Sequence, residues 1–329
     1  MSEKANKKVS ETLVAEGVLM DPCGTGRILS PEESAPFTEK TAEAEKINHP
    51  SITYWQSARY KLMKNSLAIM ALIMLGILIF FVVFGPALSG QKYLDIQAKL
   101  KNKPPDATFY FGTDSMGRDI FSRVWIGTRL SLLVALVCSF IQILAGCAYG
   151  GAMAYFGGKV DSIMMRILEV ITSFPSLLVT LLIMMVVGKN VAGLLLAMCI
   201  TSWCGTARQI RGQLMQLREA EYVQAAQMMG ASPVRIISKH LLPNTIGILI
   251  LNLCSSIPNY IFIEASLSFL GMGLADVISL GVLIASGKAK LSFYPWQLFY
   301  PAAILCLAVL AFNLLGDALR DALDPRMEA

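Results

Sequence analysis

Long apolar blocks without ionisable residues, separated by short polar segments, dominate the sequence from residue 65 to residue 316. A helix needs about 20 apolar residues to cross the roughly 30 Å hydrocarbon core of a bilayer. Apolar residues run continuously through the blocks instead of alternating, so the pattern predicts membrane-spanning helices rather than a β-barrel. Six blocks qualify, of which the fourth is the weakest: 65–91, 130–158, 170–188, 190–207, 241–263 and 291–316.

Composition and charge agree with a membrane protein. Hydrophobic residues make up 55% of the chain and charged residues 16%, unlike an ordinary soluble domain. With the N-terminus inside, 18 of the 28 Lys and Arg residues fall in cytoplasmic segments, which predicts that both termini are cytoplasmic. The sequence has no dense basic stripe with interleaved aromatic residues, so nothing in it indicates a nucleic-acid partner. Six of the seven cysteines lie in apolar blocks and none forms a CxxC, so we interpret them as small core residues.

The blocks divide the chain into segments. Residues 51–65 place Ile52, Trp55, Ala58 and Leu62 on one helical face, which predicts an amphipathic helix at the membrane surface. The remaining predicted segments are a disordered cytoplasmic tail (1–50), the first transmembrane helix (66–89), an extracytoplasmic segment (90–129), a core with five transmembrane helices (130–318) and a cytoplasmic C-terminal tail (319–329).

The cytoplasmic segment 208–244 has the pattern of two helices joined by a tight turn. A helix is predicted over about 211–229. Gly230 suits the left-handed position after its C-terminus because glycine has no Cβ. Ser232 is a good N-cap for a second helix, and Pro233 fits its first position.

The second of these helices is amphipathic. Val234, Ile237 and Leu241 share one face, and Arg235 and Lys239 share another. The segment carries more apolar surface than a connection needs. Two interpretations remain: it packs on its own transmembrane helices, or it docks into a partner.

This segment resembles the EAA loop of ABC-importer permeases. The matching positions are Ala225, Ala226, Gly230, Ile236 or Ile237, Leu242 and Pro243, and Gln224 stands where that family has Glu. The resemblance implies an ATPase-coupling loop that contains Gln224, Ala225, Ala226, Gly230, Ser232, Pro233, Arg235, Ile237, Leu242 and Pro243.

Further motifs sharpen the resemblance to the oligopeptide/dipeptide/nickel permeases, and to the C-type subunit in particular. They are FGTDSMGRDIFSRVWIGTRLSL (111–132), YFGGKVDSIMMRILEVITSFPSLL (155–178), EASLSFLGMG (264–273) and AFNLLGDALRDALDPR (311–326). The similarity covers about 55–326. At 274–281 the chain reads LADVISLG, without the family's Pro-rich stretch but with Ser279 and Gly281.

The resemblance implies an all-α membrane protein of MetI-like fold, a type I importer permease with six transmembrane helices and a cytoplasmic coupling loop. It implies a multi-pass subunit of the inner or plasma membrane, surrounded by lipid. The implied partners are a homologous second permease, two cytoplasmic ABC ATPase subunits that bind ATP and Mg, and an extracytoplasmic substrate-binding protein. Peptides are the implied cargo and nickel or another metal chelate the alternative.

The segment before the second block carries several marked residues. Thr113 or Asp114 is expected to cap a short helix, and Asp119 and Arg123 to form an i,i+4 ion pair. If the outer face handles substrate, Arg118, Arg123 and Arg129 are the candidate residues. The alternative is a solvated, capped helix.

Two residues stand out inside the apolar blocks. Glu264 is either a functional carboxylate of the translocation path or a group that reaches water at the outer end of its helix. Pro175 predicts a kink in the third helix, with Ser173 and Ser176 satisfying freed carbonyls.

No nucleotide or metal motif is found. Gly157-Gly158-Lys159 is followed by Val160 and lacks the upstream Gly of a phosphate-binding loop, and H-E-x-x-H is absent. We therefore expect a transport subunit without its own ATPase, cofactor or metal site. Two other classes remain for comparison: an ion-coupled secondary transporter, for which Glu264 is the one candidate acid, and a membrane-embedded hydrolase.

Overall fold

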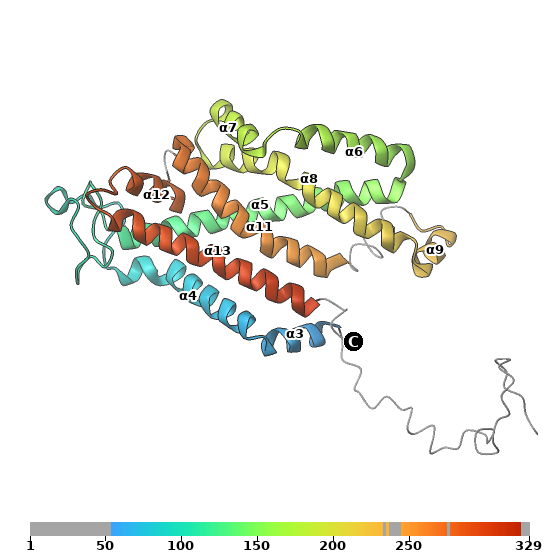
Figure 1. The fold of residues 1–329 in the computed structure, drawn as a ribbon, viewed down its shortest axis with the longest axis horizontal. Helices are drawn as coiled ribbons and strands as arrows, with labels where there is room; N and C mark the ends of the chain where they lie inside the picture. Colours follow the sequence, from blue (N-terminus) through green and yellow to red (C-terminus); the bar gives the residue numbers. More distant parts are fainter. Residues whose placement is uncertain (1–53, 233–234, 237–244, 275–276, 324–329) are drawn as a thin grey trace, which may run out of the picture. The chain divides into compact units, whose positions relative to one another are not determined.

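The computed structural model describes residues 54–232, 235–236, 245–274 and 277–323, and every named element in these ranges is a helix (Figure 1). The predicted tail 1–50 lies outside the described residues. The described helices are α3 (Tyr54–Lys64), α4 (Ser66–Leu88), η1 (Ala98–Leu100), α5 (Ile120–Phe156), α6 (Gly158–Thr172), α7 (Ser176–Val187), α8 (Val191–Arg218), α9 (Glu221–Met228), α11 (Ile246–Leu267), η4 (Ser268–Met272), α12 (Leu280–Lys288) and α13 (Trp296–Leu323).

The apolar blocks form the long helices of this bundle. Five helices in the described ranges are long and apolar enough to cross a membrane, namely α4, α5, α8, α11 with η4, and α13. The pair α6 and α7 forms a sixth candidate span that is bent by 75°. The all-α class is confirmed, and the count of six holds when the bent pair is one span.

The third predicted crossing is interrupted where Pro175 predicted a kink. Helix α6 ends at Thr172 and α7 begins at Ser176, so the helix expected over 170–188 is not continuous. The Ser173 hydroxyl donates a 2.7 Å hydrogen bond to the Val170 carbonyl in the last turn of α6, not to the Ile171 carbonyl that Pro175 leaves without its helical donor.

Helix α5 begins ten residues before the predicted block because Asp119 caps it. The Asp119 carboxylate accepts from the Ser122 amide at 2.9 Å and from the Ser89 hydroxyl at 2.7 Å. The expected cap at Thr113 or Asp114 is therefore wrong. The expected Asp119–Arg123 ion pair is wrong as well, because Arg123 Nε instead lies 3.7 Å from Asp114.

Helix α8 is longer than the fourth block, and the helix predicted over 211–229 is broken. The chain leaves helical geometry after Arg218 and resumes it at Glu221, where α9 begins. No Gly or Pro marks this break in the sequence.

Helices α5 and α8 lie side by side and share the most extensive contact between two helices of the bundle (Figure 1). Gly146 and Gly150 make it possible, because a Cβ on Gly150 would lie 2.4 Å from the Ala207 carbonyl oxygen. Small residues four apart let helix backbones approach closely in a bilayer, where van der Waals contact drives helix association.

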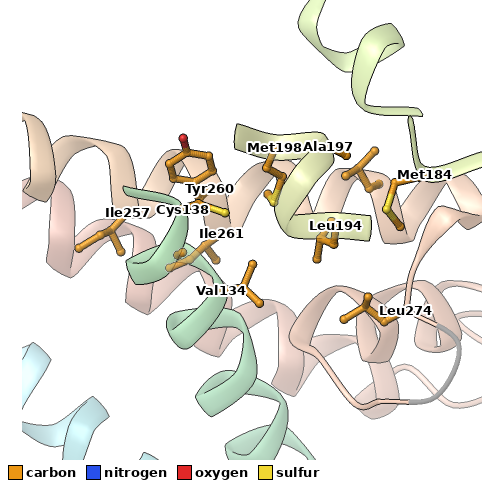
Figure 2. Close-up of a cluster of buried hydrophobic side chains, with 12 residues drawn as sticks. Val134, Cys138, Met184, Leu194, Ala197, Met198, Ile257, Tyr260, Ile261 and Leu274 are labelled. Atoms are coloured by element: carbon orange, nitrogen blue, oxygen red, sulfur yellow. The ribbon is translucent and has the colours of Figure 1, made fainter. Parts of the chain in front are cut away.

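A buried apolar cluster joins α5, α7, α8 and α11 (Figure 2). Cys138, Met184 and Tyr260 are almost completely buried in this cluster. Many apolar side chains elsewhere are exposed, including Phe80 on α4 and Leu182 on α7. Such surfaces suit contact with lipid or with another membrane subunit.

Candidate functional site

Helix α9 lies beyond the end of α8, at the opposite end of the bundle from α12 (Figure 1). Its inner face is fixed to the bundle. Val223 and Ile236, both fully buried, join Leu214 of α8 and Ala154 of α5 in one apolar cluster. Ala226, one turn after Val223, is 3% exposed. The segment is therefore a packed part of the bundle, not a loose connection.

The turn after α9 has the predicted chemistry. Gly230 has φ 78°, and the Ala231 amide donates to the Ala226 carbonyl at 3.1 Å, the bond that closes a Schellman helix end. The prediction of Gly230 at the left-handed position is confirmed. Ser232 Oγ accepts from the Arg235 amide at 3.4 Å, the contact that an N-cap residue makes, but most of the helix that Ser232 is predicted to cap lies outside the described residues. Four predicted loop residues lie outside the described ranges: Pro233, Ile237, Leu242 and Pro243.

The outer face of α9 ends in two exposed methionines. Met228 is 89% exposed and Met229 82%, and Gln224 and Ala225 are also exposed. Methionine is flexible and polarizable, which suits an apolar docking contact that must adapt to a partner surface. Neither methionine was predicted as a site residue. The available signal was their place just before a helix-ending glycine, where side chains leave the packed face.

Gln224, which replaces the family's Glu, has a local hydrogen bond. Its Nε2 donates to the Glu219 carbonyl at 3.1 Å, next to the break between α8 and α9. A carboxylate has no proton to donate there at neutral pH. Gln224 therefore makes a hydrogen bond at the start of α9 that an ionised Glu at this position could not donate.

Polar contacts connect the end of α8 to its neighbours. The Arg218 guanidinium donates to the carbonyls of Ala154 at 2.9 Å and Tyr155 at 3.3 Å, at the end of α5. Arg211 of α8 forms an ion pair with Asp161 of α6. These contacts connect the part of α8 next to α9 to both α5 and α6. A displacement of α9 would therefore be transmitted to α5, α6 and α8.

At the other end of the bundle, Glu264 is buried with only 2% exposure. Its carboxylate accepts hydrogen bonds from Ser131 of α5 at 2.9 Å, from Ser268 at 3.1 Å and from Ser279 at 2.6 Å. Glu264 therefore does not reach water, which was one of its two expected situations. The carboxylate is a connector between helices.

The three candidate arginines do not form one site. Arg118 makes a short ion pair with Asp114, with Nε at 2.8 Å and Nη2 at 2.7 Å from Oδ2. Arg123 is buried beside the same carboxylate at 3.7 Å.

Arg129 has a different environment, on the face of α5 that meets α4. Its Nη2 donates to the Val82 carbonyl at 2.7 Å. Pro86, four residues after Val82, has no amide hydrogen and leaves that carbonyl without its helical partner. Arg129 replaces the missing donor, so its observed role is structural.

Comparison with known proteins shows the family of this chain. Residues 142–329 match the family of binding-protein-dependent transport system inner membrane components, and residues 53–105 match the N-terminal transmembrane domain of oligopeptide transport permease C. The chain belongs to this permease family, whose members have the MetI-like fold.

Individual relatives cover nearly the whole chain. It is 44% identical over 291 residues to the dipeptide transport system permease protein DppC of Bacillus subtilis, covering 88% of this chain and 91% of the relative. Identity to the oligopeptide permease OppC is 39% for the B. subtilis protein, over 89% and 96% of the two chains. For the Escherichia coli OppC it is 38%, over 86% and 95%.

Proposed function

We propose that this chain is one of two permease subunits of an ATP-driven importer, and that its cargo is peptide. The names of the relatives support the cargo, since they are oligopeptide and dipeptide permeases. The coupling role rests on one observation about α9. Its inner face is packed into the bundle, while Met228 and Met229 are almost fully exposed. A surface of this kind is suited to receive force from a partner and transmit it.

In this proposal, α9 and the turn at Gly230 sit in a groove of one ATPase subunit. Closure of the two ATPase subunits on ATP displaces α9 as a rigid lever. Arg218 and the buried Val223 carry the displacement into α5 and α8, which alternately open the path between the two permeases to either side. The ATPase subunits hold ATP and Mg, and this chain supplies no catalytic group.

The proposed orientation has α9 and both termini in the cytoplasm. The excess of Lys and Arg in the segments on that side supports it. The start of α5 and the connection between α12 and α13 then face outward, where a binding protein delivers cargo.

Uptake by the reconstituted complex tests the proposal. Proteoliposomes would contain this chain, its second permease and the ATPases, with binding protein outside and ATP inside. We expect ATP-dependent uptake of labelled di- and tetrapeptides. Uptake of a nickel chelate but no peptide would support the metal-chelate alternative. Uptake by this chain alone, driven by an ion gradient without ATP, would overturn the proposal in favour of a secondary transporter.

A further inference from the structure

A small cavity of about 180 Å³ with both polar and apolar lining residues lies between the segment 114–123 and the facing parts of α12, α13 and their connection. Its polar lining residues include Asp114, Ser115, Arg118, Arg123, Lys290 and Gln297. Three of these side chains are cations and one is a carboxylate. The cavity therefore carries excess positive charge.

Both oxygens of the one carboxylate, that of Asp114, already accept hydrogen bonds. Asp114 Oδ2 accepts from Arg118 at 2.8 Å, and Oδ1 accepts from the amides of Met116 at 2.8 Å and Arg118 at 3.0 Å. Arg118 and Asp114 thus neutralise each other. Arg123 lies farther from the same carboxylate, at 3.7 Å, so one carboxylate faces two guanidinium groups and Lys290 adds a third cation.

Arg123 is buried and incompletely bonded. It is 6% exposed, and its Nε makes no hydrogen bond. Its Nη1 donates only a long hydrogen bond, 3.5 Å, to the Tyr93 carbonyl. Lys290 is half-buried and forms no ion pair with a carboxylate in the described part of the chain. A buried guanidinium N–H without an acceptor is costly, and a bound anion would offset that cost. The planar fork of Arg matches a carboxylate especially well.

The size of the cavity limits what can enter. Drug-sized ligands occupy pockets of roughly 300–1,000 Å³. The cavity therefore fits a carboxylate with a few neighbouring atoms, which is one end of a peptide and not a whole peptide.

The position of the cavity is compatible with a solute from the outer side. Helix α5 has 37 residues, so it is about 55 Å long, compared with roughly 30 Å for the hydrocarbon core. Arg123 lies in the first two turns of α5. The N-terminal end of α5 lies at the end of the bundle opposite α9 (Figure 1). In the proposed orientation this end is extracytoplasmic.

We infer that this cavity binds a single carboxylate group between Arg123 and Lys290, and that the group is the C-terminal carboxylate of an incoming peptide. The source of the carboxylate rests on the proposed function. The anion chemistry of the cavity rests only on its own residues. Arg118 and Asp114 act as positioning residues that hold the wall of the cavity.

Calorimetric titration of the purified permease complex in nanodiscs tests this inference, without binding protein or ATP. The probes are the dipeptide Ala-Ala, its C-terminal amide and acetate. We expect Ala-Ala and acetate to bind and the amide to bind at least about tenfold more weakly, as for loss of a charge-assisted hydrogen bond. Lys290→Gln should weaken Ala-Ala by a similar factor. Arg123→Gln should do the same if it folds.

Lys288→Gln is the matched control, because Lys288 is an exposed cation two residues away that lies over the Phe269 ring and outside the cavity. It should bind Ala-Ala as the unmodified chain does. Equal binding of the amide, an equal effect of the two lysine variants, or binding of acetate without Ala-Ala would each overturn the inference.

Peptide uptake in proteoliposomes separates the two proposals. Unchanged carboxylate binding in Lys290→Gln, together with normal ATP-driven uptake, would overturn the cavity assignment alone. Lys290-dependent carboxylate binding in a complex that takes up no peptide would overturn the proposed function and leave the anion site.

Discussion

The hydroxyl of Ser279 donates a 2.6 Å hydrogen bond to the buried carboxylate of Glu264, and this contact joins α12 to the end of α11. The same carboxylate accepts from Ser131 of α5. The backbones meet closely here, since a Cβ on Gly281 would lie 2.8 Å from the Ala265 Cα. Glu264 thus fixes the short helix α12 against two long ones.

We predict that Ser279→Ala destabilises the protein by about 1–3 kcal/mol, because it removes a buried hydrogen bond and the N-cap of α12 together. Ser286→Ala is the control, since the Ser286 hydroxyl is exposed and bonds only within α12. It should change stability by less than about 0.5 kcal/mol. Thermal unfolding in detergent measures both, and equal melting temperatures would contradict the connector role of Glu264.

The contact between α5 and α8 should not tolerate a side chain at Gly150. We predict that Gly150→Leu separates the two helices and abolishes folded, monodisperse protein, because even a Cβ would meet the Ala207 backbone. Gly212→Leu, also within a helix but with no atom within 4 Å of the added Cβ, should fold. Gel filtration after detergent extraction distinguishes them; a folded Gly150→Leu protein would argue against this packing.

The bond from Arg129 to Val82 should depend on Pro86. Arg129→Met should cost roughly 1 kcal/mol in the unmodified chain, since the Val82 carbonyl loses its only replacement donor. In a Pro86→Ala background, where residue 86 regains its amide hydrogen, the cost should nearly vanish. A double-mutant cycle on unfolding free energies measures this coupling, and additive effects would refute it.

Gly230 tests the turn that ends α9. With φ 78° and no atom within 4 Å of an added Cβ, Gly230→Val acts through backbone strain of about 1–3 kcal/mol and not through a clash. We predict that peptide uptake and its coupling to ATP hydrolysis fall while the subunit still inserts. Gly230→Asn should retain more activity because Asn tolerates this conformation better. Normal uptake by a stably inserted Gly230→Val protein would count against the lever.

Local chemistry made much of this fold predictable. The apolar blocks are the long helices, Pro175 marks the break in the third, Gly230 ends α9, and Ser232 makes the contact of an N-cap residue. Each of these features depends on residues within one or two turns of one another.

Features set by distant residues were not predictable. The partners of Glu264 include Ser131, 133 positions away, and nothing in the sequence pairs them. Arg129 looked like an outward-facing cation because the freed carbonyl that it satisfies belongs to another helix. The break at Glu219–Ala220 has no Gly, Pro or strong cap that would mark it in the sequence. It depends instead on the tertiary packing of Val223, which directs α9 away from α8.

In the proposed mechanism, α9 is the contact through which the ATPase subunits drive this permease. A photo-crosslinking residue at Met228 or Met229 in the assembled transporter tests it most directly, with Phe293, 79% exposed and located in the connection from α12 to α13, as the control position. We predict ATPase adducts from positions 228 and 229, with a yield that changes when ATP is added, and none from 293. Absence of ATPase adducts from both methionines, or adducts from 293 instead, would contradict the claim.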